Sequence, residues 1–365
     1  MIDERSRSRE WIMESCKINK VNDPTLMEKA IRALSLLEAL AKSGCPFLFK
    51  GGSALMLQLG CTQRLSVDID IVCPPGTDVI AYLQPFAMEY GFGEIRSVER
   101  LSRSNVPKTH AKCYYQISYV TNRVQGKVLL DVLYEDNWYK HIENLPIESP
   151  FLLTEGEPII VNIPSKEDLL GDKLTAFAPN TTGIPYIKLR HGRDGSIEEW
   201  HCGMEIIKQL FDVASLFDRV ENLSVVHETF EKIAPLEMEY RGMVNRDLQI
   251  VLNDIYQTAE LVCTGGFTND QSFEFKELLN GVHRIKDLII SERFNQYSAI
   301  VAASKAAYLS VLLGKGVHVM KRYNPTVDLR NVRIDKPVNP TLNKIKSLKP
   351  EAFWYWMETE KLMKE

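Results

Sequence analysis

The chain has 365 residues, 45% of them hydrophobic and 25% charged, an ordinary composition for a soluble globular protein. This length predicts two domains, or one core with a large extension. The formal net charge of −4 excludes a protein that binds polyanions over its whole surface, so any contact with RNA or a nucleotide must come from a local basic patch.

The first predicted helix follows a charged N-terminal segment. Residues 1–22 have no apolar core of the kind a signal peptide carries, and we expect a loosely held lead-in. Asp23 and Pro24 are typical of a helix N-cap followed by proline at the first helical position. The apolar residues that follow have helical spacing up to Ser43 and Gly44, which predicts a scaffold helix that faces the core.

A glycine-rich turn, Gly51-Gly52-Ser53, lies between the apolar run 47–49 and an apolar, helix-like segment over 54–59. Glycines have no Cβ atom, so they adopt unusual dihedrals and let a phosphate approach the backbone N–H groups. Ser53 adds a hydroxyl donor, and a helix that begins here favours an anion at its N-terminus. The turn therefore predicts a phosphate site.

Two aspartates follow in a run of β-forming residues, 67–72, which ends at the turn 74–76. Because side chains alternate along a strand, we expect Asp68 and Asp70 on the same face, about 6–7 Å apart. Two like charges on one face favour a divalent cation between them. A phosphate turn and paired carboxylates on the next strand together predict a site for a nucleotide and a metal.

Residues 78–163 predict one helix and several strands. We expect a helix over about 78–90, a charged strand or loop over 93–104, a hairpin over 113–134 with its connection at 121–126, and a strand over 158–163. Asp131 lies inside the apolar return strand, where a buried and unpaired carboxylate would be costly. From the residues alone it is an edge-facing or hydrogen-bonded aspartate, and Glu135 and Asp136 are expected in a solvated loop.

The periodicity of the second half of the chain is mainly helical. One helix begins at Ser165, which is spaced with Asp168 as a capping pair. A helix over 204–217 has a clear apolar face. On this helix Lys208 and Asp212 are four residues apart, which by itself predicts a surface ion pair worth about a few tenths of a kcal/mol.

Two basic stretches of the second half have more than one interpretation. The basic residues between 188 and 193 belong either to a solvated loop or to a contact with RNA or a triphosphate. Near the C-terminus, several lysines precede the aromatic run 353–356. This run either stacks on RNA bases or packs as part of a terminal helix on a helical bundle.

The central motif resembles a known superfamily. Gly52-Ser53 followed by Asp68-Ile69-Asp70 resembles the signature of the polymerase-β-type nucleotidyltransferases. The fuller pattern is Lys50-Gly51-Gly52-Ser53-Ala54-Leu55 with Arg64-x-Ser66-x-Asp68-x-Asp70. It resembles the AbiEii/AbiGii toxin family, the nucleotidyltransferase toxins of type IV toxin–antitoxin and phage-abortive systems, over roughly residues 30–220.

The resemblance implies an α+β fold, in which an N-terminal, nucleotidyltransferase-type mixed sheet has flanking helices and a helical domain follows. Joined with the change of periodicity, it divides the chain into a lead-in over 1–22, a catalytic domain over 23–160 and a mainly helical domain over 161–365. The helical domain is expected to contribute residues to the active site.

The resemblance also implies the residues of a catalytic site. Asp68 and Asp70 are expected to hold Mg²⁺ or Mn²⁺, and Asp131 matches the third carboxylate that this superfamily takes from a nearby strand. Lys173 matches a lysine that faces the active site from the first helix of the second half. Asp212 is expected to position or deprotonate the acceptor.

Further residues are implied to bind the nucleotide. Gly51, Gly52 and Ser53 are expected to hold the β- and γ-phosphates, and Lys208 is carried over as a phosphate or nucleotide contact. Arg64 and Ser66 lie in the loop ahead of the acidic strand. Arg64 either contacts phosphate or holds this loop in place.

The implied function is a Mg-dependent nucleotidyltransferase toxin that transfers NMP from an NTP to tRNA or another acceptor, and that is paired with a cognate antitoxin. Two alternatives remain at this point. One is an antibiotic-type enzyme that modifies a small molecule with the same catalytic residues. The other is a non-catalytic partner-binding protein with this fold, against which the intact Ser53, Asp68 and Asp70 argue.

The seven cysteines form no Cys-x-x-Cys pair, and their number is odd. This favours a reducing compartment and argues against a disulfide framework or structural zinc. His191, His201 and Cys202 fit no zinc spacing. No apolar run approaches the roughly 20 residues of a membrane span, so we expect a cytoplasmic protein without a membrane partner.

Overall fold

The computed structural model describes residues 1–365 except 62, 100–107, 119–123, 192–194 and 292. The chain forms two compact units. Unit 1 contains Met1–Leu169 together with Asp287–Arg293, and unit 2 contains Leu170–Lys286 together with Phe294–Glu365. The domain division near residue 160 remains a prediction.

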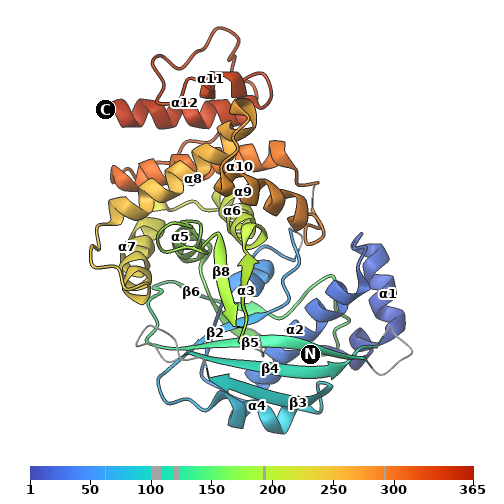
Figure 1. The fold of residues 1–365 in the computed structure, drawn as a ribbon. Helices are drawn as coiled ribbons and strands as arrows, with labels where there is room; N and C mark the ends of the chain where they lie inside the picture. The colour runs from blue at the N-terminus through green and yellow to red at the C-terminus, as the bar shows by residue number, and fades with distance from the viewer. Residues whose placement is uncertain (62, 100–107, 119–123, 192–194, 292) are drawn as a thin grey trace. The chain divides into compact units, whose positions relative to one another are not determined.

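Unit 1 is a mixed α+β unit built on one five-stranded sheet. In chain order its elements are η1 (Glu4–Arg7), α1 (Arg9–Ile18), α2 (Pro24–Lys42), β1 (Leu48–Lys50), α3 (Gly51–Gln58), β2 (Ile69–Cys73), α4 (Val79–Ala87), β3 (Phe92–Glu99), β4 (Lys108–Gln116), β5 (Gln125–Tyr134), β6 (Ile142–Pro146), β7 (Ile160–Pro164) and the start of α5 (Lys166–Ala176). The predicted fold class, a mixed sheet with flanking helices followed by a helical part, is confirmed (Figure 1).

The strand order of the main sheet is β1-β2-β5-β4-β3. Strand β2 pairs in parallel with β5, whereas β1–β2, β5–β4 and β4–β3 are antiparallel. The separate hairpin of β6 and β7 lies beside β1. Helices α2 and α4 pack against each other and against this sheet. The consequence for function is that β2 and β5, which carry Asp70 and Asp131, are neighbours at the centre of the sheet.

Helix α2 shows why the first prediction succeeds. The side chain of Asp23 accepts a hydrogen bond from the N–H of Thr25 at 2.8 Å, and Pro24 occupies the first turn. Between Ala30 and Leu40 the apolar side chains are completely buried. The scaffold helix predicted from the cap and the apolar spacing is therefore confirmed.

The N-terminal segment differs from the loosely held lead-in that the sequence predicts. Ile2 and Ile12 are buried, and the indole N–H of Trp11 donates to the carbonyl of Phe151 at 2.7 Å. The N–H of Ile2 also donates to the carboxylate of Glu38. These buried apolar side chains and hydrogen bonds hold η1 and α1 on unit 1, although nine of the first 22 residues are charged.

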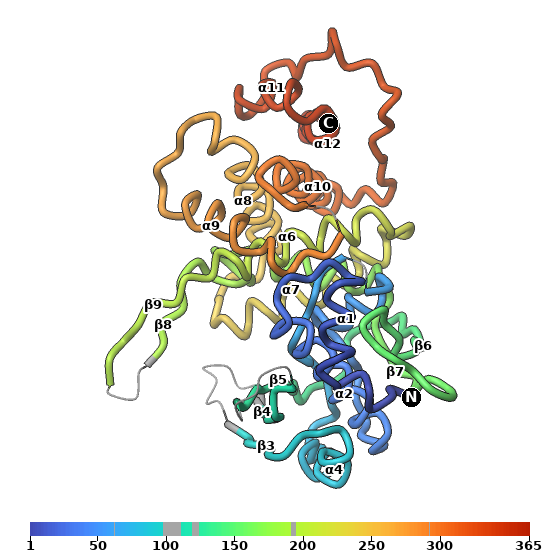
Figure 2. The backbone as a smooth tube through the Cα atoms, turned by 90° about the vertical axis from the view of Figure 1, so that its right-hand side faces the viewer, coloured from blue at the N-terminus to red at the C-terminus, as the bar shows by residue number. Residues whose placement is uncertain are grey.

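Unit 2 is mainly helical, as predicted, but it also contains a two-stranded hairpin. Its elements are the remainder of α5, β8 (Ile187–His191), β9 (Ile197–His201), α6 (Gly203–Phe217), α7 (Leu223–Tyr240), α8 (Leu248–Thr268), α9 (Phe273–Ile285), α10 (Gln296–Gly314), α11 (Leu342–Ile345) and α12 (Pro350–Lys364). Figure 2 shows the β8–β9 hairpin extending away from the helices of its own unit. Leu189 and Ile197 are exposed on it, so apolar burial gave no signal for these strands.

Helix α10 corrects the expectation that no apolar run reaches membrane length. By length and composition it is long and apolar enough to cross a membrane, and most of it is buried in the structure. Its charged residue, Lys305, forms ion pairs with Asp218 at 2.8 Å and with Glu351 at 3.2 Å. We therefore assign α10 as a core helix of unit 2.

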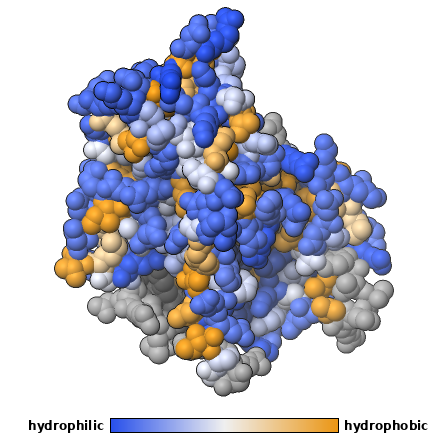
Figure 3. All heavy atoms as spheres, turned by 45° about the horizontal axis from the view of Figure 1, so that its top comes forward, coloured by the Kyte–Doolittle hydropathy of each residue, from blue (hydrophilic) through white to orange (hydrophobic). Residues whose placement is uncertain are grey.

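The C-terminal aromatic run belongs to the same core. Phe353, Tyr355 and Trp356 on α12 are almost completely buried, and the ring of Tyr355 meets that of Phe217 edge to face at a centroid distance of 5.2 Å. Packing on the helical bundle is therefore the correct interpretation, and stacking of RNA on this run is not. The face of the molecule in Figure 3 is mostly hydrophilic, with small scattered apolar groups.

Candidate active site

The register of the central strands places two predicted carboxylates side by side. Asp70 on β2 is the partner of Lys50 on β1 and, in the parallel direction, of Asp131 on β5. Registered residues on neighbouring strands lie about 5 Å apart and present their side chains on the same face. Lys50, Asp70 and Asp131 thus lie side by side across the sheet, and all three are half-buried. The two carboxylates, Asp70 and Asp131, are called the acidic row below.

Asp68 is placed differently from the prediction, because β2 begins at Ile69 and Asp68 lies just before the strand. Its Oδ1 atom lies 3.6 Å from the Nζ atom of Lys29 on α2. The same oxygen is buried and has no hydrogen-bond partner. Lys29 was missed in the sequence, where it is one charged position in an apolar helix and belongs to no motif.

A divalent cation suits the chemistry of these carboxylates. Carboxylate oxygens are the ligands that Mg²⁺ and Mn²⁺ prefer, and the buried Oδ1 of Asp68 is an acceptor without a hydrogen bond. Within the part of the chain that the structure describes, however, no group of three His, Cys, Asp or Glu side chains is arranged to hold a metal ion. The donor set of Asp68, Asp70 and Asp131 fits the ion in kind, and its role as a metal site stays a proposal.

The backbone of the turn lies directly against the acidic row. Gly51 has a φ of +77°, and a Cβ atom built on it would lie 2.1 Å from the Oδ2 atom of Asp70. A side chain at this position would both strain the backbone and collide with the carboxylate. Only glycine therefore allows Asp70 to approach the beginning of α3 this closely.

Gly52 has a similar relation to the loop that precedes β2. A Cβ atom there would lie 2.8 Å from Nη2 of Arg64 and 2.9 Å from Oγ of Ser66. Arg64 and Ser66 are both buried, with 4% and 8% of their surfaces exposed. Their guanidinium and hydroxyl groups are thus held against the first turn of α3.

This first turn can bind an anion. The N-cap residue of α3 is Lys50, whose side chain makes no capping hydrogen bond, so the first N–H groups of the helix have no side-chain cap. A helix N-terminus carries a partial positive charge, and the guanidinium of Arg64 adds a full one. A phosphate at this place would interact favourably with both.

Ser53 is fully buried, and its Oγ donates a hydrogen bond to the backbone carbonyl of Asp68. The hydroxyl thereby ties the turn to the acidic segment. Its proton is engaged in this bond, so the backbone N–H of Ser53, rather than its side chain, is the donor better suited to a phosphate. The phosphate contact expected of Ser53 remains a prediction.

A segment far away in the sequence holds the Arg64 loop. The N–H of Leu65 donates to the carbonyl of Leu288 at 2.7 Å, Arg64 forms a bridge with Ile289, and the N–H of Ile290 donates to the carbonyl of Gln63 at 3.0 Å. Residues 287–293 belong to unit 1 for this reason. No local pattern in the sequence pointed to this contact.

Unit 2 brings together two other predicted residues. Nζ of Lys173 on α5 lies 3.1 Å from Oδ2 of Asp212 on α6 and 3.1 Å from Oε1 of Gln209. Lys173 is 6% exposed and Asp212 is completely buried, so the interpretation of Asp212 as part of a surface ion pair is wrong. Lys208, one turn before Asp212 on α6, is half-buried.

Comparison with models of protein families shows the family to which this chain belongs. The model for the nucleotidyl transferase AbiEii toxin of type IV toxin–antitoxin systems matches residues 35–289, more than half of the chain. The chain belongs to the AbiEii family. It is therefore a nucleotidyltransferase, and the resemblance read from the central motif is confirmed. Family membership implies an NTP substrate, a divalent metal and a cognate antitoxin.

Two solved structures are similar to this AbiEii-family chain. JHP933 from Helicobacter pylori is 14% identical, with a TM-score of 0.42, and the similarity covers 80% of this chain and 94% of JHP933. A second H. pylori protein, assigned as a nucleotidyltransferase, is 16% identical, also with a TM-score of 0.42, over 80% of this chain and 96% of its own. No curated protein matches the chain.

The region matched by the AbiEii model ends at Ile289, inside the segment that bonds to the Arg64 loop. It begins within α2, after the position of Lys29. The family region thus includes the turn, the acidic row, the Arg64 loop and the distant segment that supports this loop.

Proposed function

We propose that this protein is a cytoplasmic toxin that transfers NMP from an NTP to a hydroxyl group of tRNA. The observation that carries the proposal is the parallel register of Asp70 and Asp131 beside the first turn of α3. Two carboxylates at neighbouring, half-buried positions form a set of oxygen donors of the kind that a divalent cation prefers. The adjoining glycine turn supplies the anion site that a triphosphate requires.

The β- and γ-phosphates would bind at this first turn. The N–H groups of Gly52 and Ser53 face the end of the helix, and Gly51 keeps the backbone open to an anion. Arg64 and Ser66, held against Gly52, add a charged donor and a hydroxyl donor. This arrangement would hold the pyrophosphate portion of the NTP on one side of the acidic row.

Asp68, Asp70 and Asp131 would hold Mg²⁺ or Mn²⁺, which when bound neutralises charge on the phosphates. Asp131 would accept the proton of the acceptor hydroxyl. The hydroxyl oxygen forms a bond to the α-phosphorus, the bond from that phosphorus to the bridging oxygen of the β-phosphate breaks, and pyrophosphate leaves.

In unit 2, Lys173 and Lys208 would neutralise the nucleotide, and Asp212 would position the acceptor. An ammonium group has three N–H donors. Asp212 and Gln209 take two of the donors of Lys173 in the described structure, which leaves one for a phosphate oxygen. Asp212 would then also hold the ammonium group of Lys173 in place.

The transfer is tested by incubating the purified protein with α-³²P-labelled NTPs, Mg²⁺ and total bacterial tRNA. We expect labelled tRNA with the wild type, no label with Asp70→Asn, and no label when EDTA replaces Mg²⁺. Equal labelling by wild type and Asp70→Asn would remove the acidic row from the mechanism. Label on a small molecule or protein, with none on tRNA, would overturn the proposed acceptor.

Toxicity is tested separately by inducing the wild type and Asp70→Asn at matched levels in a bacterial host. We expect growth arrest with the wild type alone, and relief when the cognate antitoxin is co-expressed. Normal growth with both versions would contradict a toxin. Equal arrest by both would show that the toxicity does not come from the transferase site.

A further inference from the structure

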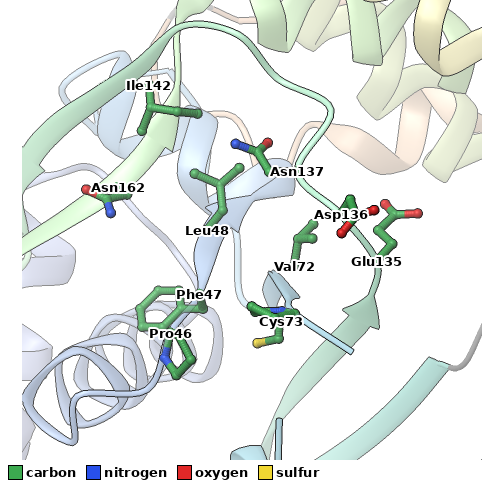
Figure 4. A pocket seen from close by; sticks show the side chains of 11 residues that line it. Pro46, Phe47, Leu48, Val72, Cys73, Glu135, Asp136, Asn137, Ile142 and Asn162 are labelled. Atoms are coloured by element: carbon green, nitrogen blue, oxygen red, sulfur yellow. The ribbon is translucent and has the colours of Figure 1, made fainter. Parts of the chain in front are cut away.

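A cavity of about 340 Å³ opens in unit 1 beside β1 and β2 (Figure 4). Its floor includes Leu48 at the start of β1 and Val72 near the end of β2. Leu48 and Val72 are partners in the same antiparallel register that pairs Lys50 with Asp70, two residues later on β1 and two residues earlier on β2. The floor is therefore on the same face of the sheet as the acidic row and begins about 7 Å from Asp70.

The neighbouring strand continues this shared face. Glu135 follows the end of β5, and its N–H donates to the carbonyl of Cys73 at 3.1 Å, which extends the pairing of β5 with β2. By alternation Glu135 belongs to the same face as Asp131. Figure 4 shows Glu135 and Asp136 together at one side of the cavity.

The direction of β1 places the cavity and the phosphate turn at opposite ends. The turn follows Lys50 at the end of β1, whereas the cavity lies at Leu48, where the strand begins. The acidic row lies between them. In an in-line displacement the attacking hydroxyl approaches from the side opposite to the leaving pyrophosphate. With the pyrophosphate at the turn, the cavity is on the side from which the acceptor must come.

The lining of the cavity excludes phosphate but suits an uncharged group. Two carboxylates, Glu135 and Asp136, and two amides, Asn137 and Asn162, stand over an apolar floor, and no lysine or arginine is among its described lining residues. Carboxylates repel phosphates and accept hydrogen bonds from hydroxyl and amino groups. Amide side chains both donate and accept hydrogen bonds, and the exposed edge of a nucleic-acid base carries both acceptors and donors. The volume is at the lower end of the range for small-molecule pockets and can hold one nucleoside.

We propose that this cavity binds the terminal nucleoside of the RNA acceptor. The base covers the apolar floor at Leu48 and Val72, and the carboxylates and amides bind the ribose hydroxyls and the base edge. The attacking hydroxyl then points along the sheet face toward Asp131, which takes its proton as the oxygen bonds to the α-phosphorus. The RNA phosphates stay outside the acidic rim. The inference rests on the proposed transfer to RNA.

Two matched variants on β7 test the proposal. Asn162 is exposed and lines the cavity, whereas Ile160, on the same face of β7 and 51% exposed, does not line it. We expect Asn162→Trp to raise the KM for total tRNA at least tenfold and to leave the KM for NTP unchanged. Ile160→Trp should leave both unchanged. Both positions are exposed, so the two variants should unfold at the same temperature as the wild type.

Several outcomes would overturn the inference. If the wild type labels tRNA and Asn162→Trp has the same KM for tRNA as Ile160→Trp, the cavity is not the acceptor site, although the proposed function stands. A raised KM for NTP would assign the cavity to the nucleotide instead. If Asn162→Trp lowers kcat by the same factor whichever substrate is varied, and the KM values for tRNA and NTP are unchanged, Asn162 has only a structural role.

A binding experiment tests the cavity even if no transfer to RNA is found. Saturation-transfer NMR with adenosine and cytidine should detect binding to the wild type and to Ile160→Trp, and should detect none to Asn162→Trp. Kanamycin is the competing cationic probe. If kanamycin displaces the nucleosides when it is present at a lower concentration than they are, or if only kanamycin binds, the occupant of the cavity is a cationic small molecule and not an RNA nucleoside.

Discussion

The acidic row of unit 1 and the Lys173–Asp212 pair of unit 2 deal with charge in opposite ways. Strand register brings like charges together in the row, at positions that remain half-buried. The pair joins opposite charges 3.1 Å apart in the interior, where the lysine and the aspartate are both buried. The row gathers carboxylate donors at half-buried positions, whereas the pair encloses a charge and its counter-charge in the interior.

This difference shows which observation identifies a functional site. A buried ion pair costs desolvation and recovers it from its own partner, so its presence alone indicates structure as readily as chemistry. Neighbouring carboxylates repel each other and together offer oxygen ligands to a divalent cation, so their proximity points more directly to chemistry. Lys29 on α2 lies 3.6 Å from Asp68, the third carboxylate of the proposed site.

The largest expected effect comes from removing one charge of the row. We expect Asp131→Asn to reduce kcat/KM for transfer by about 1,000-fold or more, because charge stabilisation at the phosphates is lost. Its folding stability should change far less than its activity, because asparagine keeps the shape of this half-buried side chain. Enzyme kinetics and urea unfolding measure the two effects on the same sample.

The control for this change is Glu157→Gln, which removes an exposed carboxylate of the same unit. It should leave both measurements unchanged. A clear loss of stability in Asp131→Asn with activity retained would mean that Asp131 is a structural aspartate, and the contrast between the two charge clusters would fail.

The second effect concerns the pair in unit 2. Lys173→Met should destabilise the protein by about 3–5 kcal/mol, because it leaves Asp212 buried without its cation. The double variant Lys173→Met/Asp212→Leu removes both charges and should recover most of this loss. Urea unfolding of the wild type, the single and the double variant measures the difference. A double variant as unstable as the single one would show that packing, not charge, explains the loss.

The two clusters also differ in how far the sequence could predict them. The cap at Asp23–Pro24, the glycine turn and the alternation around Asp70 are local signals, and the elements they predict are present. The pairing of Asp70 with Asp131 is not local, because parallel strands are joined by a long connection whose register no short pattern specifies. Asp131 was singled out by family resemblance, and only the sheet explains its place.

Contacts between distant segments account for the rest of what was missed. Lys29 meets Asp68 across two separate elements, and residues 287–293 meet the Arg64 loop from much later in the chain. The β8–β9 hairpin was missed for a different reason. Its second strand is exposed along its whole length, so it has no alternation of buried and exposed residues for a sequence pattern to show.

The third effect tests whether the row works together with the turn. Gly52→Ala places a methyl group within 3 Å of both Arg64 and Ser66, so these donors must shift. We expect the KM for NTP to rise by about 10- to 100-fold, since small displacements of positioning groups have effects of this size. Gly93→Ala is the control, because a Cβ atom there meets nothing within 4 Å. An unchanged KM in Gly52→Ala would remove the turn from nucleotide binding.

The smallest expected effect concerns an ionisable group that is buried without an opposite charge. Burial raises the pKa of the Cys61 thiol from 9.0 to about 11, so the folded protein keeps this thiol neutral. Below pH 9 the thiol is protonated in both the folded and unfolded states. Between pH 9 and 11 the unfolded chain releases the proton while the folded chain keeps it, so this contribution to stability falls as the pH rises.

Urea unfolding from pH 8 to 11 should therefore show a decline in the free energy of unfolding that is smaller in Cys61→Ala, by at most about 2–3 kcal/mol at pH 11. Parallel declines in the two proteins would show that Cys61 ionises as easily when folded as when unfolded, and that burial alone does not keep a group neutral in this loop.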